Sequence, residues 1–413
     1  MFHDSSPHVI VIGASVAGLA ASGLFSRHAL VTVVENDLVE EGVYNRAGTP
    51  QDQHIHVLME GGKQALEALF PGFENALVRN GALLADRSLD VNWYHHGLWK
   101  AKYKDGKKMT LVTRPLVDHT LRQFFGKDVR FMYGQRVKEL LWSTNGVAGV
   151  KLASGETLLA DLVIDATGRN TRAEAWLSVQ VPTVITNVHL RYLTMLYEFP
   201  EEYEFPSMVT AQYEGRTCGA LTQLSYKAVP GGSGRKDRKY AIATLWEYGE
   251  HQTPCASVAD FVGFAKRLEM PNIADILANG RSLSDTPKVF AYPRQIRRCW
   301  EQVSLPRGFL SVGDACCSFT PAYGQGMTHA AVGILKLAPY ASSLVNDKTF
   351  DFEIARKVLA GVSLVPFLMN KIEDSRTLGK DGEHIIEKKF LRSVIRAGAR
   401  NEYVARRIHR VAN

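Results

Sequence analysis

The hydrophobic pattern at the start of the chain predicts a strand, a helix and a second strand in close succession. The apolar run HVIVIG ends at a glycine, small and apolar residues continue to about Ser26, and the run LVTVVEN follows. A short buried strand, a glycine-bearing turn, a helix and another strand make a βαβ unit. We therefore expect the chain to open with a βαβ unit.

Further along, the pattern changes twice. Residues 61–80 have helical spacing interrupted at Pro71-Gly72, residues 89–113 read as short strands, and a helix is expected at 116–125. More strands are expected near 129–133, 137–143, 146–152 and 160–168. From about 180 to 290 the strand-like segments LRYLTMLYEF, SMVTAQYE and KYAIATLWEY dominate, with one helix at Val258–Arg267. The run GFLSVGDA at 308–315 then restores the strand-turn-helix pattern, and residues from about 327 read as helical.

These patterns predict an α/β protein in which a discontinuous Rossmann-like domain receives an inserted, mainly antiparallel β-sheet domain and ends in a helical segment. The Rossmann-like domain is expected at 1–85, 111–178 and 291–345. The sheet domain is expected at 86–110 and 179–290, and the C-terminal helical segment at 346–413.

Composition and charge narrow the class of protein. The chain has 413 residues, 46% of them hydrophobic and 22% charged, and no apolar run approaches the roughly 18 residues of a membrane-spanning helix. The start of the chain lacks the basic region of a secretion signal, so we expect a cytoplasmic protein. The five cysteines form no CxxC pair, and the adjacent Cys316 and Cys317 are expected to be small buried residues.

The net charge of +7 is concentrated near the C-terminus. From Arg376 onward there are ten Lys/Arg and four Asp/Glu, so this segment carries +6. We interpret the charge as a solvated helix face and expect no nucleic-acid partner, because no aromatic interleaving or binding motif accompanies it. Contact of this basic helix with a membrane surface is a lesser alternative.

The first motif that carries chemistry is the turn Gly13-Ala14-Ser15-Val16-Ala17-Gly18 between the first strand and helix. Gly13 allows the tight turn, Gly18 allows close helix–strand packing, and the helix N-terminus attracts a pyrophosphate. Ser15 replaces the middle glycine of the usual fingerprint. Glu35 ends the next strand, 22 residues after Gly13, where a carboxylate accepts from a ribose hydroxyl. The pair predicts a dinucleotide, FAD or NAD in preference to NADP.

Two further motifs follow buried strands. Gly313-Asp314-Ala315 places a carboxylate where it can hold a ribityl hydroxyl, and the turn at Gly324–Gly326 opens a helix whose N–H groups can face a flavin ring. The third motif is Asp161-Leu162-Val163-Ile164-Asp165-Ala166-Thr167-Gly168-Arg169. Together the three motifs point to FAD.

With these three motifs, the chain to about residue 345 resembles the FAD-dependent monooxygenase superfamily of aromatic hydroxylases, halogenases and alkene epoxidases. More narrowly it is similar to the bacterial polyether-epoxidase branch. This likeness is carried by Arg46-Ala47-Gly48-Thr49-Pro50-Gln51 with His54 and His56, by Phe70-Pro71-Gly72, by Thr113-Arg114-Pro115-Leu116 and by Arg297-Arg298. The resemblance makes the Rossmann-like domain an FAD-binding domain and the inserted sheet a substrate domain.

The resemblance also implies residues and chemistry. It places Arg46 and Arg114 near the FAD phosphates or ribityl chain, and Pro321, Gly324, Gln325, Gly326 and Met327 beside the flavin ring. The expected cofactor-binding set is Gly13, Ser15, Ala17, Gly18, Glu35, Arg46, Arg114, Asp314, Gly324, Gly326 and Met327. The implied reaction inserts one oxygen atom from O2, through a flavin C4a-hydroperoxide, into a small apolar secondary metabolite. No obvious catalytic base is visible, which favours epoxidation, or attack on an electron-rich ring, over base-assisted hydroxylation.

One residue departs from the aromatic hydroxylases. They have an aspartate before the glycine of the middle motif, which helps in handling NAD(P)H, and this chain has Thr167. The flavin is therefore expected to be reduced either by NAD(P)H directly or through a separate flavin reductase or ferredoxin-type donor. The GWxWxIP motif and a convincing counterpart of the catalytic lysine of the tryptophan halogenases are absent, which makes halogenation a minor alternative.

Histidines and aromatic residues complete the candidates. His54 and His56 share a strand face, but no carboxylate stands at ligand spacing, so we expect no metal and interpret the pair as structural or as lying at the edge of the cofactor. Substrate-pocket candidates are Tyr213, Trp246 and Tyr323, with Trp93, Tyr94 and Tyr248 as further aromatic residues that serve equally well as core.

Two rival functions remain open. An FAD-dependent reductase of isoprenoid double bonds, of the geranylgeranyl-reductase kind, would use the same architecture without oxygen. A non-catalytic binder of a lipidated partner, like the Rab dissociation inhibitor, would need no flavin-ring cradle.

Overall fold

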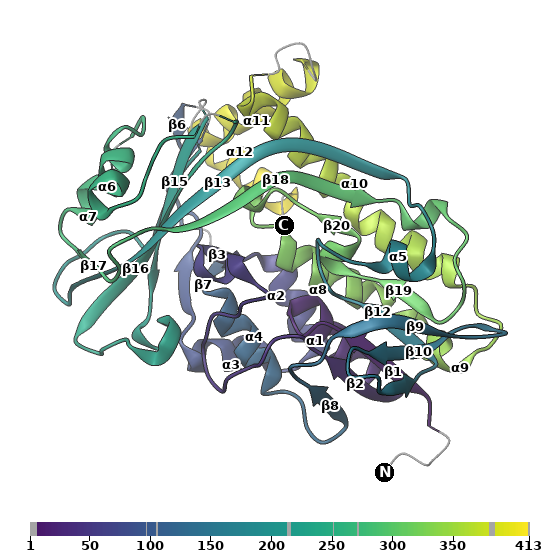
Figure 1. The fold of residues 1–413 in the computed structure, drawn as a ribbon. Coiled ribbons are helices and arrows are strands. Elements are labelled where there is room, and N and C mark those ends of the chain that lie inside the picture. Colours follow the sequence, from purple (N-terminus) through teal and green to yellow (C-terminus); the bar gives the residue numbers. More distant parts are fainter. Residues whose placement is uncertain are drawn as a thin grey trace.

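The computed structural model contains two large sheets, with helices packed between and beside them (Figure 1). It describes residues 6–95, 97–104, 106–212, 216–250, 252–270, 272–379 and 385–411.

A five-stranded parallel sheet forms the base of the molecule, in the order β19-β12-β1-β2-β8. Its strands are β1 (His8–Ile12), β2 (Leu30–Val34), β8 (Val129–Met132), β12 (Leu162–Asp165) and β19 (Phe309–Ser311). β1 pairs in parallel with β2 and β12, and β12 pairs in parallel with β19, although residues 166–308 lie between these last two strands in sequence. The predicted βαβ opening and the return of residues 308–315 to the first domain are confirmed.

Helices cover one face of this sheet and a small antiparallel sheet covers the other. The helical layer consists of α1 (Val16–Phe25), α2 (Glu60–Leu69), α3 (Phe73–Asn80), α4 (Arg114–Arg122), α8 (Gly326–Leu337) and α9 (Ala341–Asn346). Apolar residues of β1, β2 and these helices form one core cluster, with Val9, Val11 and Leu19 fully buried. The opposite face carries β9 (Val137–Ser143), β10 (Gly146–Leu152) and β11 (Thr157–Leu159), which pack on Ile10 and Ile12. Both faces are thus buried, as a parallel sheet requires.

The second large sheet has nine strands, in the order β20-β18-β13-β16-β15-β14-β5-β6 with β17 beside β13. They are β5 (Val91–His95), β6 (Leu98–Trp99), β13 (Thr183–Pro200), β14 (Met208–Gln212), β15 (Thr217–Leu224), β16 (Arg238–Glu247), β17 (Arg281–Ser282), β18 (Lys288–Arg298) and β20 (Cys317–Ser318). Segment 86–110 contributes β5 and β6, and β18 continues past residue 290, where the sheet domain was expected to end. The domain boundaries themselves stay a prediction.

Two helices cover the outer face of this sheet. α6 (Val258–Lys266) matches the predicted helix, and α7 (Asn272–Leu277) was missed because its six residues are too short to show a helical period. Phe261, Phe264 and Ile273 pack from these helices against Leu193 and Leu245 of the sheet. The inner face of the sheet therefore remains available for a site.

The remaining elements connect these layers. A third sheet joins β3 (His56–Leu58), β7 (Lys108–Val112) and β4 (Leu83–Asp86), and α5 (Ala173–Leu177) follows β12. Short 3-10 turns lie at Pro50–Gln53, Tyr226–Ala228, Pro230–Gly232, Trp300–Gln302, Gly313–Ala315, Pro321–Tyr323 and Ala338–Tyr340.

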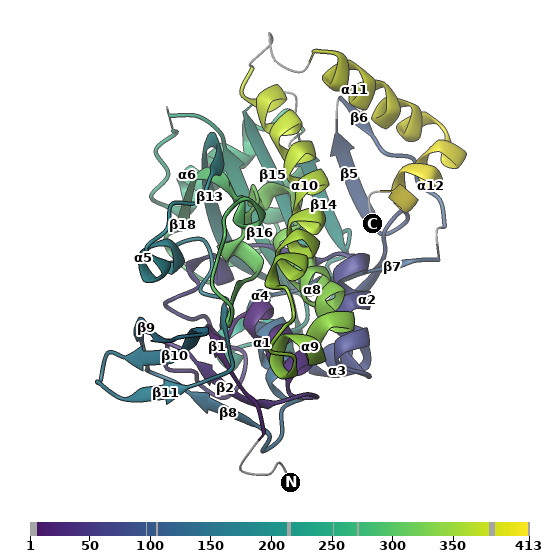
Figure 2. The ribbon, with the colours of Figure 1, turned by 90° about the vertical axis from the view of Figure 1, so that its right-hand side faces the viewer.

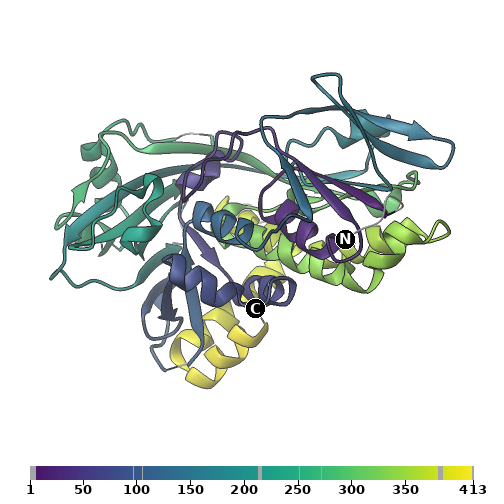
Figure 3. The same cartoon turned by 90° about the horizontal axis from the view of Figure 1, so that it is seen from below.

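The C-terminal segment is helical, as expected, in α10 (Phe352–Thr377), α11 (Ile385–Arg400) and α12 (Glu402–Val411). α10 packs along α8, whereas α11 and α12 lie beside the β5–β6 region (Figures 2 and 3). Among the described residues, every helix is too short or too polar to cross a membrane. All five cysteines are free, and Cys316 and Cys317 are buried, which confirms the expectation for that pair.

Candidate functional site

A cavity of about 630 Å³ lies between the parallel sheet and the inner face of the nine-stranded sheet. Its size falls within the roughly 300–1,000 Å³ of cofactor and ligand pockets. Four segments that follow parallel strands line it: the turn after β1, Glu35 after β2, Thr167 after β12 and Asp314 after β19. Ligands of open α/β sheets bind at this carboxyl edge of the strands. The cavity is therefore where a dinucleotide is expected.

The glycine turn after β1 brings backbone close to the cavity. Gly13 has a φ of +104°, and a Cβ at this position would lie 2.6 Å from the carbonyl oxygen of Ala166. A Cβ on Gly18 would lie 1.9 Å from the carbonyl oxygen of Gly13, so the absence of a side chain at Gly18 allows α1 to pack closely against the turn after β1. Gly18 itself does not line the cavity. The first turn of α1 has no side-chain cap, which leaves its N–H groups to a ligand.

Ser15, Ala17 and Glu35 all line the cavity. The Glu35 carboxylate accepts hydrogen bonds from the backbone N–H of Ala14 at 2.7 Å and of Asp37 at 2.9 Å. These bonds hold the carboxylate at the edge of the β1–α1 turn, where an adenosine ribose would have to lie. Its role in binding FAD stays a prediction, and its position agrees with that role.

Arg46 is the centre of a buried charge cluster. Its guanidinium donates to Glu35 at 3.2 Å, to Asp118 at 2.8 Å and to the hydroxyl of Ser15 at 2.6 Å. Burial by itself lowers the pKa of Arg46, but the carboxylates of Asp118 and Glu35 raise it above its usual value. The sequence reasoning missed Asp118, which stands on α4, 72 positions from Arg46.

Arg114 lines the cavity at the start of α4 and pairs with Asp52, whose carboxylate oxygen lies 3.4 Å from the arginine Nε. Burial raises the pKa of Asp52 to about 6, although Arg114 opposes the shift. Arg46 and Arg114 therefore both line the cavity, and each is held in place by carboxylates of the fold. This is a donor set that fits a pyrophosphate.

Asp314 and the turn before α8 form a second wall of the cavity. Pro321, Gly324, Gly326 and Met327 line the cavity, and a Cβ on Gly326 would lie 3.9 Å from a carboxylate oxygen of Asp314. In the part of the chain that the structure describes, the Asp314 side chain has no hydrogen-bond partner, and burial raises its pKa. An acceptor held without a partner beside a cavity suits a ligand hydroxyl. Gln325 ends the turn but does not line the cavity.

The middle motif forms a tight loop tied to its own strand. Asp165, fully buried, accepts from the backbone N–H of Thr167 at 3.0 Å and from its hydroxyl at 2.5 Å. Its other oxygen accepts from Thr171 at 2.5 Å and from Ser311 at 3.2 Å. The Thr167 side chain is thus committed to Asp165, and it exposes no carboxylate to a nicotinamide nucleotide.

The opposite end of the cavity is aromatic. The inner face of the nine-stranded sheet contributes the lining residues Tyr192, Met208, Thr210, Ala220, Trp246, Phe290 and Tyr292. Arg169 covers this end, with its guanidinium 4.7 Å from the centre of the Tyr292 ring. One cavity therefore joins the polar end at the carboxyl edge of the parallel strands to an apolar, aromatic end.

The other aromatic candidates lie elsewhere. Tyr94 packs on the outer side of the sheet, and Trp93 lines a second, smaller pocket. Tyr248 is buried behind the wall, and Tyr323 points to helix α10 because its hydroxyl donates to Asp374 at 3.0 Å. Tyr213 lies outside the described residues. Trp246 is thus the one sequence-predicted pocket residue that lines the main cavity among those the structure describes.

His54 and His56 both line the cavity. Burial lowers the pKa of His54 to about 3 and of His56 to about 4, so both imidazoles are neutral at physiological pH. His56 Nδ1 lies 2.8 Å from the carbonyl oxygen of His54. Among the described residues, no group of three metal-ligating side chains is close enough to hold an ion.

Helix α10 supplies a buried carboxylate that the sequence did not indicate. Asp374 accepts from Thr320 at 2.6 Å and from Tyr323 at 3.0 Å, the two residues that bracket Pro321. Burial raises the pKa of Asp374 to about 7. The C-terminal segment thus contacts the turn that lines this wall of the cavity.

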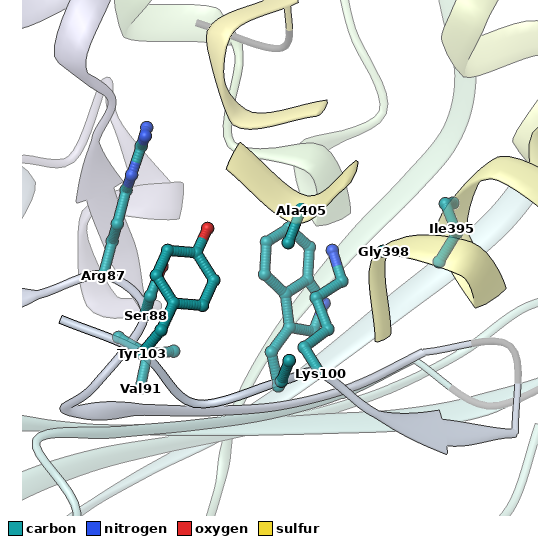
Figure 4. Close-up of a pocket in the computed structure, with 10 residues that line it drawn as sticks. Arg87, Ser88, Val91, Lys100, Tyr103, Ile395, Gly398 and Ala405 are labelled. Atoms are coloured by element: carbon teal, nitrogen blue, oxygen red, sulfur yellow. The ribbon is translucent and has the colours of Figure 1, made fainter. Parts of the chain in front are cut away.

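The second pocket, of about 20 Å³, lies between the β5–β6 region and helices α11 and α12 (Figure 4). Lys100 and Tyr103 stand on one side and Ile395 and Ala405 on the other. The Lys100 ammonium lies 3.2 Å from the centre of the Trp93 ring, and burial lowers its pKa to about 7. The volume accommodates about one water molecule, so the pocket is a packing seam of the C-terminal helices.

Comparisons with known proteins bear on the fold. No family model matches the chain. Protein Rv3254 of Mycobacterium tuberculosis is 28% identical over 398 residues, which cover 89% of this chain and 80% of that protein. Two solved structures are similar over nearly their whole length. The p-nitrophenol 4-monooxygenase PnpA of Pseudomonas putida has a TM-score of 0.67 at 14% identity, covering 97% of this chain and 96% of its own.

The second is PqsL of Pseudomonas aeruginosa, a probable FAD-dependent monooxygenase, with a TM-score of 0.63 at 16% identity. The match covers 90% of this chain and 98% of PqsL. At such low identity these likenesses establish the fold: the chain has the α/β fold of FAD-dependent monooxygenases, with a Rossmann-like domain. The narrower likeness to the polyether-epoxidase branch stays a prediction.

Proposed function

We propose that this protein is an FAD-dependent monooxygenase that inserts one oxygen atom into a small apolar secondary metabolite. One observation carries the proposal: a single cavity runs from the glycine turn after β1, past Asp314 and the turn before α8, to an aromatic wall. Such a cavity holds a dinucleotide and a second, apolar molecule end to end. When bound and reduced, FAD would supply activated dioxygen.

The residues of this chain would then bind, orient and exclude water. Arg46, Arg114 and the first turn of α1 would hold the phosphates, Glu35 would hold a ribose hydroxyl, and Asp314 would hold the ribityl chain. Met327 and the N-terminus of α8 would lie beside the ring, where the helix dipole stabilises negative charge. The aromatic wall would hold the substrate and keep water away from the reacting oxygen.

The cavity wall favours a reaction that needs no strong base. Among the described residues that line its aromatic end, the titratable side chains are Tyr192, Tyr292, His54 and Arg169. Burial raises the pKa of both tyrosines and lowers that of His54, so none of them readily removes a proton at neutral pH. This supports epoxidation of an alkene, or attack on an already electron-rich ring, over base-assisted hydroxylation.

The source of electrons follows from Thr167. Thr167 stands where the aromatic hydroxylases have an aspartate, so this position offers no carboxylate to NAD(P)H, and its hydroxyl donates to Asp165 instead. We therefore propose that a separate flavin reductase or ferredoxin-type donor reduces the flavin.

The visible spectrum of the purified protein tests these proposals. Flavin absorbance that survives gel filtration is expected, and a colourless preparation that FAD does not restore would refute the FAD-binding function. Anaerobic addition of NADH or NADPH should bleach the flavin slowly, whereas a reductase with NADH should bleach it rapidly. Fast bleaching by the nucleotide alone would contradict the separate donor.

Oxygen dependence separates the proposal from a reductase of double bonds. With trans-stilbene as the alkene probe and 2-naphthol as the electron-rich ring, isotopically labelled dioxygen should place one labelled atom in the product, measured by mass spectrometry. Saturation of the alkene under anaerobic conditions would favour the reductase instead.

A further inference from the structure

His54 lies on the cavity wall at the point where the aromatic end begins. Its ring centre is 5.6 Å from that of Tyr192 and 5.5 Å from that of Phe290. Only 4% of the residue is exposed, and it lines the cavity. The His54 ring therefore forms part of the surface that an apolar molecule would meet.

A buried chain of hydroxyl groups holds this ring. Its Nδ1 lies 2.6 Å from the hydroxyl of Thr194, which in turn lies 2.7 Å from the hydroxyl of Thr244. The two threonines face each other across β13 and β16, and both are almost fully buried. The backbone N–H of Ile55 donates to Thr244 at 3.1 Å, which closes the chain.

The Ile55 amide gives the chain its direction, because a backbone N–H can only donate. Thr244 accepts from it, and in the described part of the chain Thr194 is the only other partner of that hydroxyl. Thr244 must then donate to Thr194, since a buried hydroxyl without an acceptor is costly. The hydrogen of Thr194 is left for His54 Nδ1. With Nδ1 as an acceptor, a neutral imidazole carries its hydrogen on Nε2.

The Nε2 atom is available to a ligand. It has no hydrogen-bond partner in the described part of the chain, and it is not among the polar atoms that the fold seals from solvent. Because burial lowers the pKa of His54 to about 3, the ring stays neutral near its apolar neighbours. Such a group matches an uncharged oxygen better than a carboxylate, which would be buried there without a positive charge.

We propose that His54 presents a fixed Nε2–H donor to the substrate, and that the substrate is a flat apolar molecule with an uncharged acceptor oxygen, such as a ketone or ester carbonyl. The inference rests on the proposed function only in treating the aromatic end of the cavity as the substrate chamber. His54 would orient the molecule by holding its carbonyl oxygen, while Tyr192, Trp246 and Phe290 enclose its apolar body.

Binding of a matched pair of probes tests the donor. The probes are 9-fluorenone and fluorene, two flat molecules that differ by one carbonyl oxygen. Titration calorimetry on the FAD-reconstituted protein should show fluorenone binding about tenfold more tightly than fluorene. In His54→Phe the preference should vanish, and in Thr194→Val it should weaken because Nδ1 loses its donor. Thr222→Val is the matched control, a buried threonine of the same sheet that does not line the cavity, and it should keep the preference.

The tautomer can be observed directly. The ¹⁵N spectrum of imidazole-labelled protein, with the His54 signals assigned by their loss in His54→Phe, should show hydrogen on Nε2. Thr194→Val should shift His54 toward the other tautomer. Hydrogen on Nδ1 in the wild type, or equal affinity for the two probes, would overturn the inference.

Both measurements distinguish this inference from the proposed function. If the protein fails to bind FAD, the function falls, while the tautomer and the probe preference can still be measured in the flavin-free cavity. If flavin binds and oxygen is transferred but the probe preference is absent, only the role of His54 falls.

Discussion

The carboxylate of Asp374 accepts a hydrogen bond of 3.0 Å from the hydroxyl of Tyr323, and so joins helix α10 to the turn before α8. Thr320 donates to the same carboxylate at 2.6 Å. The C-terminal segment is therefore part of the site, because it holds the residues on both sides of Pro321.

Replacing Asp374 by Asn should change how stability depends on pH. Burial raises the pKa of Asp374 from its usual 3.8 to about 7 in the folded protein. The stabilising contribution of this group is then complete below about pH 4 and lost as pH rises through about 7. Urea denaturation should show that the free energy of unfolding of the wild type falls between about pH 5 and about pH 8. Relative to Asp374→Asn, this fall should amount to about 3 kcal/mol. A stability difference that is the same at both pH values would contradict the assigned pKa.

Gly18→Ala should abolish FAD retention and lower the melting temperature. The new Cβ would lie 1.9 Å from the carbonyl oxygen of Gly13, and backbone on both sides must shift to relieve the overlap. Overpacking of this kind costs about 1–3 kcal/mol or more. Gly361→Ala on α10 is the control, since a Cβ at that position would meet no heavy atom within 4 Å. That variant should keep its flavin and be unchanged or slightly more stable; normal flavin content in Gly18→Ala would refute the packing argument.

Arg46→Met should destabilise the protein strongly even without FAD. It leaves the carboxylates of Asp118 and Glu35 buried without their cation, a loss that typically costs about 3–5 kcal/mol. Thermal unfolding of the flavin-free protein measures it. Arg235→Met breaks a fully exposed pair with Asp237 and should leave unfolding unchanged. If the two variants unfold alike, the Arg46 cluster contributes nothing to the fold.

Asp314→Asn should separate cofactor binding from folding. Burial raises the pKa of Asp314, so neutralising the carboxylate should leave the flavin-free protein as stable as the wild type or more so. FAD affinity should nevertheless fall by about tenfold or more, because a charged acceptor for a ribityl hydroxyl is lost. Fluorescence titration with FAD checks the second effect, with the exposed Asp128→Asn as control. Unchanged FAD affinity would remove Asp314 from the site.

Local pattern was enough to predict which strand-end residues meet at one wall of the cavity. Gly13, Glu35 and Asp314 each follow a short apolar strand, and parallel strands of one sheet bring their carboxyl ends to a common edge. The residues at those strand ends must therefore meet, however long the insertion between them. The same reasoning predicted the position of the Gly324–Gly326 turn and the helix that it opens.

The partners that complete the site could not be predicted in this way. Asp118 meets Arg46 across 72 positions, Asp374 meets Tyr323 across 51, and His54 meets Thr194 across 140. No periodicity links such pairs, because their approach depends on how helices and sheets pack rather than on any strand end.

The aromatic residues show the same division. In the sequence Trp93, Tyr94, Trp246 and Tyr248 are equally good candidates for a pocket, yet of these four only Trp246 lines the main cavity. The pleat of the strands and the helices that cover one face decide on which face of the sheet each side chain lies. By itself the sequence determined the fold class and which strand-end residues share one wall of the cavity, through motifs that each lie along a single strand. Only the tertiary structure decided the charge cluster around Arg46, the contact of Asp374 on α10 with the turn before α8, and the direction in which His54 donates. Each of these depends on contacts between segments that are distant in the sequence.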